Sequence, residues 1–150
     1  MNGTYQNILF CTDFSPNAGR AFSFALESAR HHPGCTLTLL HVLPEPEAQF
    51  WKTYLSKIEG VDEKAKADID AKINASYRPL VPDTIDFRTA FRIGNPARTI
   101  VDYATENKSD LIVIGRQGTG AFFFGNVASA IARHAPCPVL IIPAQYSCST

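Results

Sequence analysis

The segment Leu111-Ile112-Val113-Ile114-Gly115-Arg116-Gln117-Gly118 joins a short apolar run to a turn that contains two glycines. The segment Ile8-Leu9-Phe10-Cys11-Thr12-Asp13-Phe14-Ser15 has the same form, an apolar run followed by a polar turn. Short apolar runs bounded by turn residues are typical of strands that are buried on both faces of a sheet. If the two strands are parallel, both turns lie at the same edge of that sheet.

Outward from these two strands, stretches that suit strands alternate with stretches that suit helices. The expected strands are residues 7–12, 35–42, 85–93, 111–114 and 139–142. Helices are expected after the N-caps Ser15, Asn95 and Asn126, and over the amphipathic stretch 47–77, with a break at Gly60. This order predicts a single α/β domain over residues 1–150, an open five-stranded parallel sheet with helices on both faces.

The composition narrows the class of protein. At 150 residues with 45% hydrophobic residues, the chain is long enough and apolar enough for one globular domain. The 14 basic and 14 acidic side chains cancel, which speaks against a nucleic-acid partner. No apolar run reaches the length of a membrane span and the first residues lack a signal-peptide pattern, so we expect a cytoplasmic protein without a membrane partner. Cys11 and Cys35 lie in or beside apolar runs and are expected to be buried thiols.

The two polar turns suggest a binding site. Glycines at the carboxyl ends of parallel strands let backbone N–H groups approach a ligand, and a helix that begins just beyond them favours an anion. On open α/β sheets, nucleotides bind at this edge, where the strand order reverses. Asp13 follows the first strand directly, and two interpretations of it remain open: a ligand contact, or a cap of the helix that begins near Pro16.

The order and spacing of several motifs resemble the universal stress protein family over nearly the whole chain. The matching segments are Ile8 to Ser15, Leu39-Leu40-His41-Val42, Gly94-Asn95-Pro96, Asp110 to Gly115, and His134-Ala135-Pro136-Cys137-Pro138-Val139-Leu140. The resemblance implies the strand order 3-2-1-4-5 in a Rossmann-like sheet. It also implies a homodimer through the last strand, Val139 to Ile142, and an adenine nucleotide, ATP or AMP, as the ligand, with Mg²⁺ as a candidate ion.

The resemblance also implies a set of binding residues. Cys11, Asp13 and Val42 would surround adenine and ribose, with Thr12 beside them, and Ile114 and Gly115 would flank the ribose. Gly118, Gly125, Asn126 and Val127 would hold the phosphates. The nucleotide-binding branch of the family has nine residues between its second and third glycines and then Ser or Thr. Here only residues 119–124 separate Gly118 from Gly125, and Asn126 replaces the hydroxyl residue.

Three functions are compared with these residues. The first is a stress-responsive regulator that binds ATP, ADP or AMP and hydrolyses it slowly at most, because no general base or carboxylate pair converges on the phosphate side. The second is a nucleotide-independent dimeric interaction module that lost phosphate binding with the shortened loop. The third, an adenylyl transferase, lacks the HIGH-type and SGGxDS-type motifs of that class.

Overall fold

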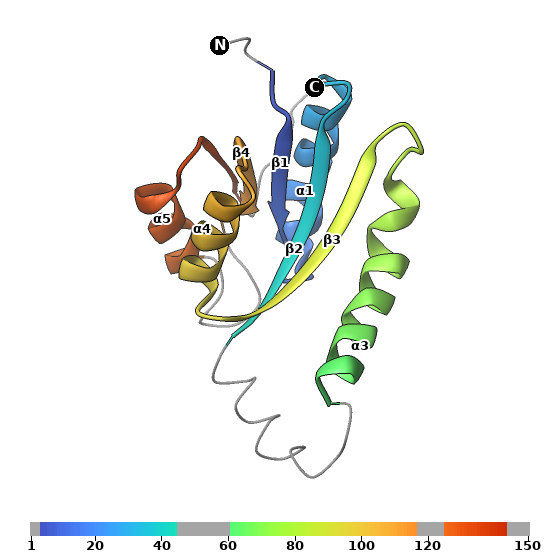
Figure 1. The fold of residues 1–150 in the computed structure, drawn as a ribbon, viewed down its shortest axis with the longest axis vertical. Helices are drawn as coiled ribbons and strands as arrows, with labels where there is room; N and C mark the ends of the chain where they lie inside the picture. Colours follow the sequence, from blue (N-terminus) through green and yellow to red (C-terminus); the bar gives the residue numbers. More distant parts are fainter. Residues whose placement is uncertain (1–3, 45–60, 117–124, 144–150) are drawn as a thin grey trace.

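The structure, a computed structural model, describes residues 4–44, 61–116 and 125–143 of the chain. Within these ranges, strands and helices alternate along the sequence (Figure 1). The elements are β1 (Asn7–Cys11), α1 (Pro16–Arg30), β2 (Thr36–Pro44), α3 (Val61–Ser76), the short 3₁₀ helix η1 (Arg78–Leu80), β3 (Asp86–Gly94), α4 (Pro96–Glu106), β4 (Leu111–Gly115), α5 (Gly125–His134) and β5 (Val139–Ile142).

The five strands form one parallel sheet in the order β3-β2-β1-β4-β5, which confirms the predicted topology. The strand β1 lies in the middle, with Cys11 opposite Leu40 of β2 on one side and opposite Ile114 of β4 on the other. The chain moves outward from β1 to β2 and β3, and then crosses back to β4. The strand order therefore reverses beside β1, which is the point where open α/β sheets bind their ligands.

Two hydrophobic layers cover the sheet, one on each face. The helices α1 and α3 pack on one face and α4 and α5 on the other, as Figure 1 shows. Successive residues of β1 point to opposite faces, so that Phe10 joins the first layer and Leu9 and Cys11 the second. All three side chains are fully buried. This two-sided burial explains why the apolar run of β1 is continuous.

Polar caps begin two of the helices where the sequence predicts them. Ser15 Oγ accepts a hydrogen bond of 3.2 Å from the backbone N–H of Ala18, and Asn95 Oδ1 accepts one of 3.0 Å from Arg98. A proline occupies the first turn of both helices. The expected cap at Asn126 is wrong, because α5 already begins at Gly125 and Asn126 lies within its first turn.

The expected helix over residues 47–77 is described only in its second half. The helix α3 runs over Val61–Ser76, and its buried residues Ile69 and Ile73 are followed by the buried Tyr77. Residues 45–60, which include the expected break at Gly60, lie outside the described ranges. Among the described helices, none combines the length and the apolar character needed to cross a membrane.

Candidate functional site

The loop between β1 and α1 leaves the sheet at its carboxyl edge. The backbone N–H of Thr12 still donates to the carbonyl of Leu40, at 3.1 Å, so the pairing with β2 continues one residue past β1. Asp13 then turns the chain, because its Oδ1 accepts a 2.9 Å hydrogen bond from the backbone N–H of Ser15. The carboxylate of Asp13 therefore supports the entry into α1. Because Asp13 is only partly buried, it also remains at the surface of this edge.

Phe14 adopts an unusual backbone conformation in this loop. Its φ angle is 63°, in the left-handed region that large residues rarely occupy. Its backbone N–H donates to Thr12 Oγ1 at 2.9 Å. Its ring packs against His41, with 4.8 Å between ring centroids, and Lys72 Nζ lies 5.3 Å from its centroid. The ring of Phe14 is thus held between β2 and α3.

Two side chains from other elements reach Thr12. The hydroxyl of Tyr77 lies 2.6 Å from Thr12 Oγ1, and His41 Nδ1 lies 2.9 Å from the Thr12 carbonyl oxygen. Because a carbonyl only accepts, this contact assigns the proton of His41 to Nδ1. Burial and then the charge of Asp13 raise the pKa of Tyr77, against the opposing effect of its hydrogen bond to Thr12, so the phenol stays protonated at neutral pH.

The end of β4 lies against α1. Gly115 is buried, and its Cα faces the side chain of Asn17. Asn17 is buried as well, and its Nδ2 donates to the carbonyl of Ile142 at 3.2 Å. The backbone N–H of Arg116 donates to the same carbonyl at 2.8 Å. Packing against Asn17 thus gives Gly115 a structural reason to be a glycine, independent of any ligand.

The other expected binding residues separate into two groups. Cys11, Val42 and Ile114 have buried side chains beneath α4 and α5, so a ligand at the sheet edge would meet their backbone atoms, and the side chain of Val127 on α5 is buried in the same layer. Burial raises the pKa of the Cys11 thiol, which therefore stays neutral. Gly125 and Asn126 begin α5, whereas Gly118 and the segment 122–124 lie outside the described ranges.

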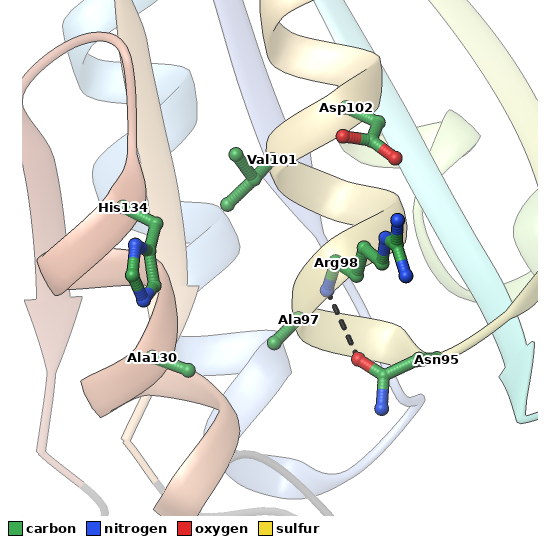
Figure 2. A pocket seen from close by; sticks show the side chains of 7 residues that line it. All are labelled: Asn95, Ala97, Arg98, Val101, Asp102, Ala130 and His134. Atoms are coloured by element: carbon green, nitrogen blue, oxygen red, sulfur yellow. Dashed lines mark hydrogen bonds between the residues drawn. The ribbon is translucent and has the colours of Figure 1, made fainter.

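The described residues also line a pocket of about 240 Å³ between α4 and α5 (Figure 2). Its lining consists of Asn95, Ala97, Arg98, Val101, Asp102, Ala130 and His134. In Figure 2, Ala97 and Val101 point toward α5, whereas the side chains of Arg98 and Asp102 extend along α4, away from His134. The polar groups do not converge on one point, and none of the expected binding residues lines this pocket.

A second pocket, of about 380 Å³, lies at the opposite edge of the sheet. It is lined by the chain that enters β1 and the turn that enters β2, namely Thr4, Tyr5, Gln6, Asn7, Pro33, Gly34, Cys35 and Thr36. Both carboxylate oxygens of the nearby Asp110 already accept hydrogen bonds, from the backbone N–H groups of Gln6 and Asn7 at 2.7 and 3.0 Å. Asp110 therefore joins β4 to β1 at this edge.

Comparison with known proteins agrees with the strand order and the motifs. A model of the universal stress protein family matches residues 4–143. The chain belongs to this family. A universal stress protein of Staphylococcus aureus strain USA300 is 31% identical over 145 residues, which cover 93% of this chain and 84% of the relative.

Solved structures of universal stress proteins share the fold. The universal stress protein UspA from Lactobacillus plantarum is 31% identical, with a TM-score of 0.74 over 94% of this chain and 99% of its own. A family protein from Arabidopsis thaliana, solved with AMP bound, is 19% identical, with a TM-score of 0.57 over 92% of this chain and 91% of its own. At 19% identity, the similarity to the Arabidopsis thaliana protein shows a shared fold and no more.

The expectation of Mg²⁺ gains no support from this universal stress protein's own side chains. In the part of the chain that the structure describes, no three His, Cys, Asp or Glu residues gather where a metal ion could be held.

Sequence reasoning missed several residues that shape this edge. Phe14, Asn17 and Tyr77 were not among the expected site residues, yet each fixes a part of it. The sequence does indicate that Tyr77 is buried, because Ile69, Ile73 and Tyr77 follow one another at intervals of four residues. His41 is buried on β2, and its hydrogen bond to the Thr12 carbonyl satisfies its Nδ1.

Proposed function

We propose that this protein is a stress-responsive regulator that binds an adenine nucleotide, ATP, ADP or AMP, at the carboxyl edge of β1 and β4. The observation that carries the proposal is the register of these two strands. Cys11 pairs with Ile114, so the loop that holds Asp13 and the turn that begins at Gly115 leave adjacent strands at the same level. This is the switch point of the sheet.

The chemistry of this edge suits a nucleoside phosphate. Asp13 offers carboxylate oxygens to the hydroxyl groups of a ribose, which are hydrogen-bond donors. The first backbone N–H groups of a helix have no partner within it, so together with the helix dipole the start of α5 at Gly125 favours a phosphate. Arg116 is exposed directly after β4 and supplies a positive charge nearby. The bound AMP of the Arabidopsis thaliana protein supports the proposal, because it shows that the shared fold accommodates this ligand.

Binding and regulation suit this site better than fast turnover. In the described ranges, Asp13 is the only carboxylate of the β1–α1 loop, and its Oδ1 already accepts from the Ser15 N–H. A general base needs a carboxylate or imidazole placed against the attacking group. We therefore propose a cytoplasmic homodimer whose state depends on nucleotide occupancy, with slow hydrolysis at most.

One feature of the sequence favours a second function, a dimeric interaction module that does not bind nucleotides. The segment between Gly118 and Gly125 is three residues shorter than in the nucleotide-binding branch that the chain resembles, and Asn126 replaces a hydroxyl residue. A shorter loop offers fewer backbone N–H groups to phosphates. The two functions differ in a simple observable, which is whether the protein binds any adenine nucleotide.

Calorimetric titration with AMP, on protein freed of nucleotide, tests the proposal. Replacement Asp13→Ala removes a hydrogen bond from a charged group and should weaken AMP binding by about tenfold or more. The matched control is Asp83→Ala, since Asp83 is exposed on the turn before β3 and should leave the affinity unchanged. Unchanged affinity in Asp13→Ala contradicts the role of Asp13. Absence of binding by the wild type to AMP, ADP and ATP supports the interaction module instead.

A further inference from the structure

The β1–α1 loop is fastened to two elements that lie far from it in the sequence. One anchor is Tyr77, 65 residues away, at the end of α3. The other is His41, 29 residues away, on β2. Both anchors hold Thr12, the residue directly before Asp13. The placement of Asp13 therefore depends on side chains outside its own loop.

The first anchor is a buried chain of hydrogen bonds. Thr12 is 1% exposed and Tyr77 4%, and their oxygens lie 2.6 Å apart. Thr12 Oγ1 also accepts from the backbone N–H of Phe14, at 2.9 Å. One hydroxyl thus joins the end of α3 to the backbone of the loop. The ring of Tyr77 is fixed in turn by Phe10 and Phe22, with centroid distances of 5.6 and 4.8 Å.

The second anchor holds the backbone of Thr12. His41 donates from Nδ1 to the carbonyl oxygen of Thr12 at 2.9 Å, and His41 is 8% exposed. Its ring packs between two phenylalanines, with centroids 4.8 Å from Phe14 and 6.3 Å from Phe91. Such contacts fix the orientation of the imidazole and therefore the direction of its N–H.

The backbone of Phe14 has a conformation that needs support from its surroundings. A φ of 63° is unfavourable for phenylalanine and persists only where the surroundings determine it. Here the surroundings are His41, Tyr77 and Lys72, all in contact with the ring of Phe14. A loop that relaxed from this conformation would turn Asp13 away from its present position.

We infer that Tyr77 and His41 are positioning residues, which hold the β1–α1 loop in the shape that presents Asp13 to the nucleotide. The inference rests on the proposed function, and it adds two residues that lie outside the expected set of binding residues. Neither side chain needs to touch the ligand. Both act through Thr12, because Tyr77 binds its hydroxyl and His41 binds its carbonyl oxygen.

A double-mutant cycle separates positioning from general stability. Tyr77→Phe removes only the hydroxyl and should weaken AMP binding by about fivefold in the wild-type background. In the Asp13→Ala background it should have no further effect, because the residue that it positions is gone. Tyr103→Phe on α4 is the matched control and should leave the affinity unchanged. An equal loss in both backgrounds, or no loss in either, overturns the inference.

Hydrogen exchange tests the same inference without a ligand. In Tyr77→Phe, the backbone N–H groups of Phe14 and Ser15 should exchange several-fold faster, while those of β4 keep their rates. At the second anchor, His41→Leu should have the same effect, whereas His41→Asn restores a donor near the position of Nδ1 and should recover most of the protection. Unchanged exchange in both Tyr77→Phe and His41→Leu overturns the inference. If the wild type binds no nucleotide but exchange accelerates as expected, the proposed function fails and the loop anchors stand.

Discussion

The side-chain oxygen Oδ1 of Asn17 lies 2.8 Å from the position that a Cβ atom on Gly115 would occupy. Asn17 belongs to α1 and Gly115 ends β4, and the amide of Asn17 also donates to the carbonyl of Ile142 at the end of β5. Three elements thus meet where Gly115 has no side chain. The glycine that first indicated a ligand turn is required by the packing of the protein itself.

Replacement of Gly115 by alanine should destabilise the protein. The added methyl group meets Asn17 Oδ1 and Cγ, at 2.8 and 2.9 Å, and the Asn17 backbone carbonyl carbon at 3.3 Å, so a buried side chain has to move. Overpacking of this kind costs about 1–3 kcal/mol of unfolding free energy. Urea denaturation of wild type and Gly115→Ala, followed by circular dichroism, measures the difference.

A second replacement at Asn17 shows whether its side chain causes the loss of stability in Gly115→Ala, and a replacement at Gly19 is the control. In an Asn17→Ala background the obstructing amide is absent, so Gly115→Ala should cost clearly less than it does alone. Gly19 is exposed within α1 and has no neighbour within 4 Å of its Cβ position, so Gly19→Ala should instead raise the stability by about 0.5–1 kcal/mol. A stable Gly115→Ala variant, or an equal cost in both backgrounds, would contradict the packing role.

The stability of the protein should fall as the pH rises above about 8.5. Burial raises the pKa of the Cys11 thiol, and burial is also the first cause of the raised pKa values of Cys35 and Tyr77. A thiol titrates near pH ~8.5 in the unfolded chain, so above that pH the unfolded state holds fewer protons than the folded state. The buried Cys11 thiol then removes roughly 1.4 kcal/mol of unfolding free energy per pH unit until its folded pKa is reached.

Denaturation series between pH 7 and pH 10.5 test this dependence. In Cys11→Ala the overall stability changes because of the lost volume, so the informative quantity is the slope of unfolding free energy against pH. That slope should become less steep by about 1.4 kcal/mol per pH unit above pH ~9. The same slope in wild type and Cys11→Ala would show that Cys11 is not the buried neutral thiol that the structure describes.

A homodimer is expected through the edge strand β5. This strand pairs with β4 on one side and ends the sheet on the other, and Leu140 is 36% exposed on it. An apolar edge strand of this kind invites pairing with a second copy. Light scattering at micromolar concentration should give the mass of two chains, and Leu140→Asp should weaken the dimer by at least about tenfold, because a charge in such an interface must be desolvated.

The matched control for the dimer is Leu80→Asp. Leu80 is 57% exposed, but it lies on η1, away from β5. It should therefore leave the mass of the assembly unchanged. A wild-type mass of one chain would contradict the proposed dimer, and equal effects of the two replacements would place the interface elsewhere.

The short segment after Gly118 leads to an expectation about the ligand. Backbone N–H groups of a glycine-containing segment before a helix can bind the outer phosphates of a nucleotide. Here the segment between Gly118 and Gly125 is three residues shorter than in the nucleotide-binding branch of the family. ATP should therefore bind no more than about a hundredfold tighter than AMP, a difference of roughly 2.7 kcal/mol. Titrations with AMP, ADP and ATP, with and without Mg²⁺, measure this ratio, and a larger preference for ATP would contradict the expectation.

Much of the fold follows from local patterns in the sequence. The apolar runs 8–10 and 111–114 predict buried parallel strands, and Ser15 and Asn95 before prolines predict helix starts, all of which the structure confirms. These signals are local, because a cap binds N–H groups a few residues away and a strand covered on both faces is a continuous apolar run. The expected cap at Asn126 is wrong because α5 already begins at Gly125, and a glycine gives no signal of a helix start.

The details of the site could not be predicted in the same way. Tyr77 meets Thr12 across 65 residues and Asn17 meets Ile142 across 125, and no spacing rule joins residues so far apart. The left-handed backbone at Phe14 has no sequence signal either, because phenylalanine disfavours it. The sequence therefore predicts which strand ends carry the site, whereas packing decides how that edge is shaped.

We propose that an adenine nucleotide binds where β1 and β4 end. Nuclear magnetic resonance on ¹⁵N-labelled, nucleotide-free protein, titrated with AMP, tests it most directly because it shows binding and place together. Binding at this edge should give saturable shifts of the backbone N–H signals of Asp13, Gly115 and Asn126, with little change at Arg98 and His134 in the α4–α5 pocket. Absence of shifts at millimolar AMP, or shifts centred on the α4–α5 pocket, would contradict it.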